Sequence, residues 1–416
     1  MTFTWDDPQL RARTARQPWL NPGAYWSDLS RAVADLDSPL AVISLEALLH
    51  NATDMVRRAG GIPIRVASKS VRVREVIDSV LALPGFAGVL AYTLPEAIWL
   101  AETVDDVVVG YPTANLNALR YLASRERLAA RITLMVDSVE QLELINRAAP
   151  AGKRAEIRVC LDFDASWQAP VLGHMGVRRS PVHSPEALQR LARRVLSEPG
   201  FRLVGILSYE AQIAGVGSAP AGRPLDGVMK RWMQKNSFAE LSARRAEAIG
   251  LVRAETELDF VNGGGTGSLE TTSTDPSITE IAAGSGLFGP HLFDNYATFH
   301  PAPAAAFALD VVRKPLPDTV TLLGGGWVAS GPAAADRLPQ VVWPRGLRYE
   351  AREAAGEVQT PLRGPVARTL RGGDRVWLRH TKAGELSEHV NVFHVVSDGA
   401  VVGTTPSYRG EGQAFL

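Results

Sequence analysis

The chain has 416 residues, of which 46% are hydrophobic, and it carries equal numbers of Lys+Arg and Asp+Glu residues, 44 of each. Its length predicts two domains, and its zero net charge argues against a protein that binds nucleic acid or a membrane surface. The single cysteine, Cys160, excludes an internal disulfide and indicates a reducing compartment. No apolar stretch approaches the ~20 residues of a membrane span and the first residues are polar, so we expect a cytoplasmic protein.

Up to residue 299, short β-branched runs alternate with segments of helical spacing. The runs lie at residues 40–43, 62–67, 88–92, 106–110, 132–136, 156–162, 203–208, 258–262 and 278–282. Apolar strands that alternate with helices indicate a parallel sheet buried on both faces. About eight βα units in roughly 270 residues favour a closed (β/α)8 barrel. We place this barrel at residues 37–299 and expect residues 1–36 to pack on a second, β-rich domain.

Lys69 ends one of these early runs, at the C-terminal mouth of its predicted strand. A lysine there can form a Schiff base with a carbonyl compound or with pyridoxal phosphate, provided that desolvation or nearby cations make its amine nucleophilic. A surface lysine after a strand is the simpler alternative. The candidate site therefore depends on what the rest of the chain places near Lys69.

A glycine-rich segment, residues 263–267, follows the run at residues 258–262, which we take as the seventh strand of the barrel. Backbone N–H groups of glycine loops can approach a phosphate closely, and Thr266 adds a hydroxyl. The segment 284–289, after the last predicted barrel strand, also contains several glycines. The loops after the last two strands of such barrels commonly bind phosphate, so these two segments predict a phosphate site.

After residue 300 the alternation of helices and strands stops. The remaining chain, residues 300–416, reads as a β domain with glycine and proline turns. Its expected strands lie at residues 307–312, 319–323, 340–343, 375–378 and 394–402.

Several motifs resemble the pyridoxal-phosphate enzymes of the alanine racemase fold type, and among them the D-threonine aldolase and D-serine dehydratase group. The matching segments are residues 37–40 and 45–51, the lysine signature 65–69, and residues 176–182, 208–212, 263–267, 279–280 and 284–285. The resemblance covers nearly the whole chain, in the same order and with similar spacing. It therefore supports the barrel with a C-terminal β domain that the apolar pattern predicts.

This resemblance implies a role for individual residues. It makes Lys69 the residue that binds pyridoxal 5'-phosphate covalently, places Arg179 near the phenolate oxygen of the cofactor, and places Tyr209 in the pocket. The remaining implied cofactor contacts are Gly264, Gly265, Thr266, Gly267, Gly286 and Leu287. The resemblance also implies a head-to-tail homodimer that acts on a small amino-acid substrate.

The chain departs from this group at the pair of residues that usually binds a divalent metal. His380 is retained, but Lys382 stands where an anionic ligand belongs. A protonated amine cannot ligate a metal, although its charge can take the place of one. We therefore expect Lys382 and His380 to act as catalytic residues, with His380 exchanging a proton near neutral pH, and we expect no metal dependence. Gln212 replaces a histidine of the group, and Gly286 replaces a tyrosine, which would enlarge the pocket.

The function predicted is that of a lyase that acts on a β-hydroxy-α-amino acid by retro-aldol cleavage or its reverse. The group that the chain resembles implies the D configuration. Catalytic roles fall to Lys69, His380, Lys382 and Tyr209. Three alternatives stay open: a D-amino-acid dehydratase or deaminase, an amino-acid racemase, and a non-catalytic protein that binds pyridoxal phosphate. A racemase needs a second base, and neither Tyr349 nor Tyr408 lies in a recognisable racemase motif.

Overall fold

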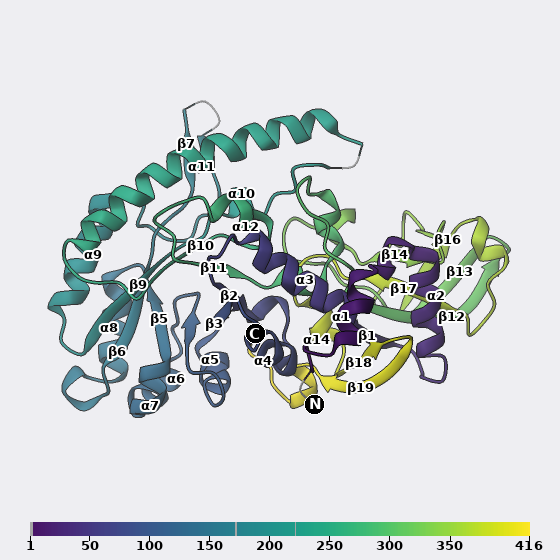
Figure 1. The fold of residues 1–416 in the computed structure, drawn as a ribbon, viewed down its shortest axis with the longest axis horizontal. Coiled ribbons are helices and arrows are strands. Elements are labelled where there is room, and N and C mark those ends of the chain that lie inside the picture. The colour runs from purple at the N-terminus through teal and green to yellow at the C-terminus, as the bar shows by residue number, and fades with distance from the viewer. Residues whose placement is uncertain (1–2, 171–172, 221) are drawn as a thin grey trace. The chain divides into compact units, whose positions relative to one another are not determined.

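Eight parallel strands close into a barrel in the computed structural model, which describes residues 3–170, 173–220 and 222–416 (Figure 1). In chain order they are β2 (Ile64–Ala67), β3 (Phe86–Ala91), β4 (Val107–Val109), β5 (Ile132–Val136), β6 (Ile157–Asp162), β9 (Phe201–Ser208), β10 (Phe260–Gly263) and β11 (Glu280–Ala283). β11 pairs with β2 and completes the ring. The predicted (β/α)8 barrel is thus confirmed, and β10 is its seventh strand.

Helices connect the barrel strands, as the helical spacing between the apolar runs predicts. They are α4 (Arg74–Leu81), α5 (Leu94–Leu100), α6 (Leu116–Ala123), α7 (Glu126–Arg131), α8 (Val139–Ala148), α9 (Pro185–Ser197), α10 (Ala211–Ala214), α11 (Pro224–Arg253) and α12 (Leu269–Thr272), whereas α3 (Leu45–Arg58) precedes β2. A small hairpin, β7 (Trp167–Ala169) with β8 (Gly173–Met175), follows β6. Thr93 and Ser184 accept backbone N–H groups at the starts of α5 and α9, which satisfies donors that a helix leaves unpaired.

A buried ionic network joins the strands where the barrel closes. The guanidinium of Arg65 on β2 bonds both carboxylate oxygens of Glu280 on β11, at 2.7 and 2.8 Å, and one oxygen of Asp106 at 2.8 Å. Asn262 on β10 donates to Glu280 at 2.8 Å. Arg65 is only 2% exposed, and Glu280 begins β11, so the network lies toward the N-terminal end of the strands. Removing one partner would leave a buried charge, which typically costs about 3–5 kcal/mol.

The C-terminal part of the chain forms most of a nine-stranded sheet. Its strands are β12 (Ala305–Leu316), β13 (Thr319–Leu323), β14 (Gln340–Trp343), β15 (Arg348–Tyr349), β16 (Gln359–Arg363), β17 (Arg375–Arg379), β18 (Val392–Ser397), β19 (Ala400–Pro406) and, from the N-terminal region, β1 (Leu40–Ser44). Helices α1 (Pro8–Ala15), α2 (Pro22–Ala32), α13 (Ser285–Phe288) and α14 (Glu385–His389) complete the elements. The expected β domain is therefore present.

β1 lies elsewhere than the apolar pattern suggests. It pairs antiparallel with β12 and parallel with β18, so it belongs to the nine-stranded sheet and is no part of the barrel. All five of its residues are buried. A strand covered on both faces gives the same continuous apolar run in either sheet, and periodicity alone cannot tell the two apart.

A hairpin replaces the single strand expected at residues 394–402. β18 and β19 pair antiparallel around Asp398 and Gly399, whose φ angles are 52° and 69°. Positive φ at both central residues is the geometry of a tight hairpin turn, and an Asp-Gly pair favours it. The turn signal lies inside an otherwise β-rich run, which is why the run reads as continuous.

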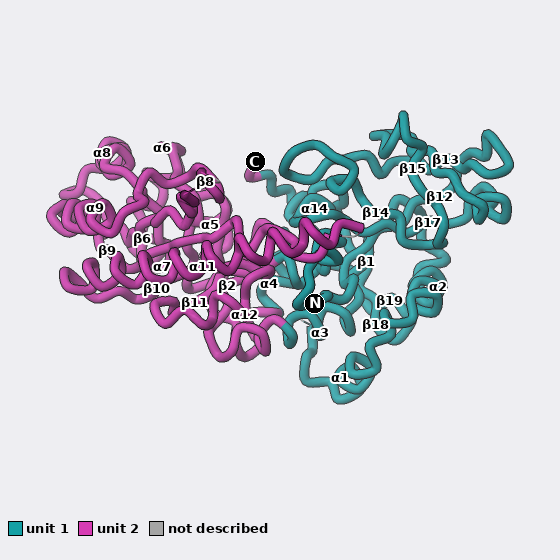
Figure 2. The backbone as a smooth tube through the Cα atoms, turned by 90° about the horizontal axis from the view of Figure 1, so that it is seen from above, with its two compact units in different colours: residues 1–54, 70–79, 285–414 teal, residues 55–69, 80–284, 415–416 magenta. Residues whose placement is uncertain are grey.

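The chain divides into two units that each combine distant segments (Figure 2). Unit 1 contains residues 1–54, 70–79 and 285–414, whereas unit 2 contains residues 55–69, 80–284 and 415–416. The division thus differs from the expected borders at residues 37 and 299, because β1 and most of α3 go with the large sheet. Within unit 1, the N-terminal segment contacts β17: the Arg375 guanidinium donates to the carbonyl oxygens of Val33 and Leu36 at 2.6 and 2.7 Å.

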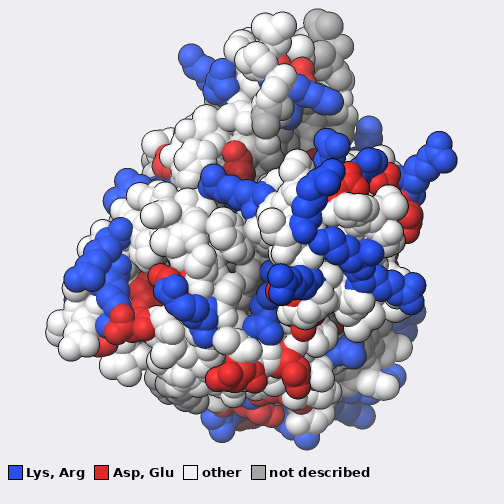
Figure 3. Space-filling model, turned by 90° about the vertical axis from the view of Figure 1, so that its right-hand side faces the viewer, with Lys and Arg blue, Asp and Glu red and all other residues white. Residues whose placement is uncertain are grey.

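The surface carries charges of both signs. On the face that Figure 3 shows, acidic and basic side chains occur beside one another, as the balanced composition leads one to expect. Among the residues that the structure describes, no helix combines the length and the apolar character that crossing a membrane requires.

Candidate active site

Lys69 lies at the C-terminal end of barrel strand β2, in a 3-10 turn (Ser68–Ser70). Its Nζ donates a hydrogen bond of 2.8 Å to the hydroxyl of Tyr111, which follows β4. The ammonium also lies 5.6 Å from the centre of the Tyr111 ring. Tyr111, which is not among the predicted site residues, therefore orients the Lys69 amine.

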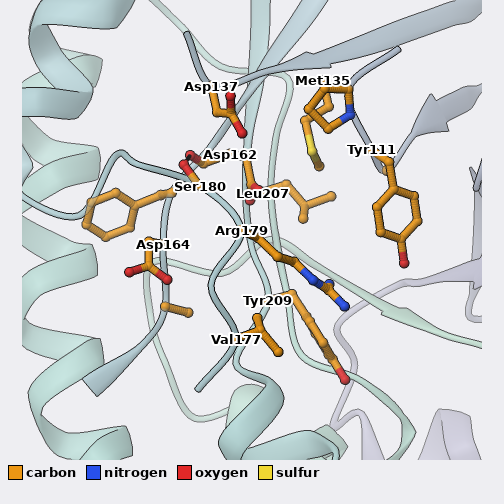
Figure 4. A pocket seen from close by; sticks show the side chains of 14 residues that line it. Tyr111, Met135, Asp137, Asp162, Asp164, Val177, Arg179, Ser180, Leu207 and Tyr209 are labelled. Atoms are coloured by element: carbon orange, nitrogen blue, oxygen red, sulfur yellow. Dashed lines mark hydrogen bonds between the residues drawn. The ribbon is translucent and has the colours of Figure 1, made fainter. Parts of the chain in front are cut away.

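A cavity of about 250 Å³ opens at the same end of the barrel (Figure 4). Its wall comes from segments that follow β4, β5, β6 and β9, and it includes Tyr111, Met135, Asp137, Asp162, Asp164, Arg179 and Tyr209. The Arg179 guanidinium lies 5.6 Å from the ring of Tyr111 and 5.5 Å from that of Tyr209. Unit 2 thus brings together three of the predicted residues, Lys69, Arg179 and Tyr209, around Tyr111.

The two tyrosines differ in acidity. Burial opposes ionisation of Tyr111, but the charge and hydrogen bond of Lys69, with help from Arg179, outweigh it and lower the pKa of its phenol. Burial also acts on Tyr209, and there it prevails over the charges of Lys69 and Arg179 and raises the pKa. Tyr111 is therefore the phenol more easily deprotonated.

Asp162, the last residue of β6, is a further ionisable group in this cavity. Burial and the negative charge of Asp137 raise the pKa of Asp162 to about 7, although Arg179 acts in the opposite direction and Asp164 adds to the rise. A carboxyl group with such a pKa exchanges its proton near neutral pH. Neither Asp162 nor Tyr111 is among the residues predicted from the sequence, although each ends or follows a barrel strand, which is the signal that identifies Lys69.

The glycine loop after β10 has a fixed shape. Gly264 has φ of +68°, and its N–H donates to Glu210 at 2.9 Å. Glu210 also accepts from Thr272 at 2.7 Å and pairs with the fully buried Arg245 at 3.3 Å. A buried carboxylate with an ionic partner therefore determines the path of this loop.

The loop has no room for larger side chains. A Cβ at Gly264 would lie 2.8 Å from Oγ1 of Thr272, and a Cβ at Gly265 would lie 3.1 Å from Ala214 and 3.3 Å from the ring of Tyr209. Thr266 and Gly267 continue into a 3-10 turn (Thr266–Ser268), and the carbonyl of Thr266 accepts from Arg58 at 2.7 Å. A close-packed glycine turn beside Tyr209 fits the backbone approach that a phosphate group requires.

The other predicted residues lie in unit 1. Gly286 and Leu287 belong to α13 and are buried, and the Leu287 carbonyl accepts from Asn51 at 3.0 Å. His380 follows β17 and is fully buried, and neither of its ring nitrogens has a hydrogen-bond partner among the described residues. Lys382 is partly exposed.

The environment of His380 corrects one expectation. Burial lowers the pKa of His380 to about 4, with a smaller opposing effect from Glu385. The imidazole is thus neutral at neutral pH, and the expected proton exchange near pH 7 is wrong for this environment. A histidine surrounded by protein loses the hydration of its charged form, which the sequence does not reveal.

The first carboxylate after His380 in the chain, that of Glu385, is already hydrogen-bonded to the backbone. Its two oxygens accept the backbone N–H groups of Thr381, Lys382 and Ala383, each at 2.7 Å. Lys382 adds a positive charge where an anionic ligand would be required. Within the described part of the chain, no group of three or more His, Cys, Asp or Glu side chains has the arrangement of a metal site.

Comparison with known proteins agrees with this architecture. Residues 43–291, more than half of the chain, match the family model described as alanine racemase, N-terminal domain. The chain belongs to this family. The resemblance inferred from the motifs is therefore confirmed at the level of the family.

Among its relatives, the chain is similar to a D-threonine aldolase from Arthrobacter sp, with 25% identity over 334 residues that cover 77% of this chain and 79% of the relative. It is also 26% identical to a 3-hydroxy-D-aspartate aldolase from Paracoccus denitrificans over 261 residues, 61% of each chain. The structure of a D-threonine aldolase from Filomicrobium marinum superposes with a TM-score of 0.74 at 19% identity, covering 91% of this chain and 96% of the other. D-threo-3-hydroxyaspartate dehydratase from Delftia sp. HT23 gives 0.68 at 21% identity, covering 89% and 97%. At these identities the two structures show a common fold.

Proposed function

We propose that this protein is a pyridoxal-phosphate-dependent lyase that cleaves a β-hydroxy-α-amino acid of D configuration into glycine and an aldehyde, or forms the same bond in reverse. The contact of the Lys69 amine with Tyr111 at the barrel mouth is the observation that carries this proposal. The named aldolases among the relatives support the choice of reaction.

The cofactor would be bound by residues from several loops. Lys69 would bind it covalently, Arg179 would face its phenolate oxygen, and Tyr209 would line its pocket. The phosphate would lie on Gly264, Gly265, Thr266 and Gly267, with Gly286 and Leu287 as further contacts. When bound, pyridoxal phosphate supplies an electron sink for the bonds at the α-carbon of the substrate.

The protein side chains orient groups and move protons. Tyr111 fixes the position of the Lys69 amine, and its lowered pKa allows it to accept a proton from that amine or from the substrate. Lys382 would steady the substrate hydroxyl or carboxylate by its charge, without a divalent metal. His380, which is neutral at neutral pH, can accept a proton but has little tendency to keep it.

A homodimer is part of the proposal. The family resemblance suggests a head-to-tail pair in which the β domain of one subunit covers the barrel mouth of the other. Sedimentation of the purified protein at decreasing concentration, followed by assay at each concentration, tests it. Loss of activity that parallels dissociation is expected, whereas a fully active monomer would argue against shared active sites.

A substrate screen on purified, cofactor-loaded protein tests the reaction. D- and L-threonine and their β-substituted analogues are supplied, and aldehyde, keto acid and enantiomer formation are recorded separately. We expect aldehyde and glycine from the D substrates. Keto acid with ammonia would identify a dehydratase or deaminase, an enantiomer alone would identify a racemase, and no product would favour a non-catalytic binding protein.

A further inference from the structure

Arg58 is a buried cation beside the glycine loop that none of the proposed catalytic or cofactor-binding roles uses. It lies in the last turn of α3, belongs to unit 2 and is only 4% exposed. Its Nη2 donates to the carbonyl oxygen of Thr266 at 2.7 Å. Burying a guanidinium costs free energy unless its donors are satisfied, so the contacts of Arg58 define what it holds in place.

Glu270 pairs with the same guanidinium. Its carboxylate accepts from Nε of Arg58 at 2.5 Å and from Nη2 at 2.8 Å. Glu270 lies in α12, whereas Thr266 lies in the 3-10 turn just before that helix. Arg58 therefore joins the end of α3 to both elements that follow the glycine loop. Because Glu270 neutralises its charge, Arg58 acts by fixing the backbone rather than by attracting anions at a distance.

The contact with Arg58 sets the direction of one peptide group in the loop. The peptide between Thr266 and Gly267 is not among the cis bonds of the chain. The C=O and N–H of a trans peptide point in opposite directions, so the N–H of Gly267 points away from Arg58. No backbone carbonyl in the described part of the chain accepts this N–H. It is thus a backbone donor held in a fixed direction.

The two preceding N–H groups of the loop are already engaged. That of Gly264 donates to the buried Glu210 at 2.9 Å, and that of Gly265 donates to Oγ of Ser268 at 3.2 Å. A phosphate bound by backbone donors therefore depends on the N–H groups further along the loop. The N–H of Gly267 is one of these.

We propose that Arg58 is a positioning residue for the cofactor phosphate. By holding the carbonyl of Thr266, it keeps the N–H of Gly267 directed at the phosphate and so raises the affinity for the phosphorylated cofactor. Arg58 acts through the backbone and need not touch the cofactor itself. The inference rests on the proposed function for the identity of the cofactor, but it does not depend on which reaction the protein catalyses.

Binding of pyridoxal phosphate and of pyridoxal, which lacks the phosphate, separates this role from a general effect on the fold. The full chain, freed of cofactor, is titrated with each compound, and the absorbance near ~410–430 nm is followed. We expect the unmodified protein to bind pyridoxal phosphate at least about a hundredfold more tightly than pyridoxal. Arg58→Met should reduce this ratio at least about tenfold and change the affinity for pyridoxal less than about threefold. Arg58→Lys, which can still donate to the Thr266 carbonyl, should recover part of the ratio.

Arg57→Met is the matched control, since Arg57 precedes Arg58 in the same turn of α3 and is exposed. It should leave both affinities unchanged. Equal weakening of both compounds by Arg58→Met would show a general effect on the fold and overturn the proposal, as would an unchanged ratio. Failure of the unmodified protein to bind pyridoxal phosphate would overturn the cofactor assignment as well. A protein that shows the expected ratios but no lyase turnover would support the role of Arg58 and contradict only the proposed reaction.

Discussion

Burial changes the pKa of ionisable groups in opposite ways at the barrel mouth in unit 2 and around His380 in unit 1. It brings one pKa close to neutrality and moves the other away from it. At the barrel mouth, Lys69 and Tyr111 contact each other, and burial brings the pKa of Asp162 to about 7. Around His380, the Glu385 carboxylate is occupied by backbone N–H groups, and burial moves the histidine pKa away from neutrality. The barrel mouth thus keeps a carboxyl group that can exchange a proton near neutral pH, whereas the imidazole of His380 stays neutral there.

Removing the Lys69 amine should have the largest effect on the barrel side of this comparison. Lys69→Ala eliminates the group that would bind the cofactor covalently, so kcat should fall at least about a thousandfold. The cofactor absorbance near ~410–430 nm should be lost as well. Lys153→Ala, at an exposed position, is the control and should retain both properties. Unchanged turnover in Lys69→Ala would remove this lysine from the site.

Changing the charge at residue 382 addresses the other region. Lys382→Ala should lower kcat/KM at least about tenfold, which corresponds to about 1.4 kcal/mol of transition-state stabilisation. Lys382→Arg should recover part of it, because the positive charge is restored. A strong chelator should not alter turnover of the unmodified protein. Stoichiometric zinc or manganese at His380, with activity lost on chelation and regained on metal return, would place Lys382 outside the site.

Removing the hydroxyl of Tyr111 should lower the rate less than removing the Lys69 amine does. Tyr111→Phe removes the hydrogen bond to Lys69 and keeps the ring, so we expect kcat to fall about tenfold, in line with the contribution of a hydrogen bond to a charged group. The alkaline limb of the pH–rate profile should shift as well, because Lys69 loses a neighbour that ionises. Tyr121→Phe, at a tyrosine that is 45% exposed, serves as the control. Identical profiles for Tyr111→Phe and the unmodified protein would contradict the role of this contact.

Replacing Asp162 should change the stability of the fold rather than the rate, because its pKa is raised by burial. Its folded-state pKa of about 7 lies above the ~3.9 of an unfolded aspartate, so its protonated form favours the fold. That contribution is complete below about pH 4 and is lost as the pH rises through about 7. Asp162→Asn should therefore gain unfolding free energy relative to the unmodified protein between pH 5 and pH 8, by about 2 kcal/mol in urea denaturation. A difference independent of pH would show that Asp162 ionises normally.

The architecture of the barrel and the position of Lys69 follow from local patterns. Apolar runs that alternate with helical segments predict the strands, and a glycine segment after the run at residues 258–262 predicts the phosphate loop. The place of β1 does not follow, because an apolar run such as residues 40–44 suits either buried sheet. The pairing of β1 with β12 and β18, which are distant in the sequence, determines which sheet it joins.

The chemistry of the site is less predictable than its position. Tyr111 and Asp162 follow or end barrel strands, yet only the closed barrel shows that both line one cavity with Arg179. The low pKa of His380 depends on its burial among residues distant in sequence, and the sequence alone suggests a histidine that titrates near neutrality. When burial and neighbouring charges set the pKa of a group, the folded structure is needed to identify that group as part of the site.

Covalent trapping of the cofactor tests the central claim most directly. The purified protein, loaded with pyridoxal phosphate, is reduced with borohydride, digested and mapped by mass spectrometry, with the Lys69→Ala variant as a parallel sample. The account predicts a single pyridoxyl label on Lys69 and none in the variant. A label on another lysine, or equal labelling of the variant, would contradict the assignment of the barrel mouth as the cofactor site.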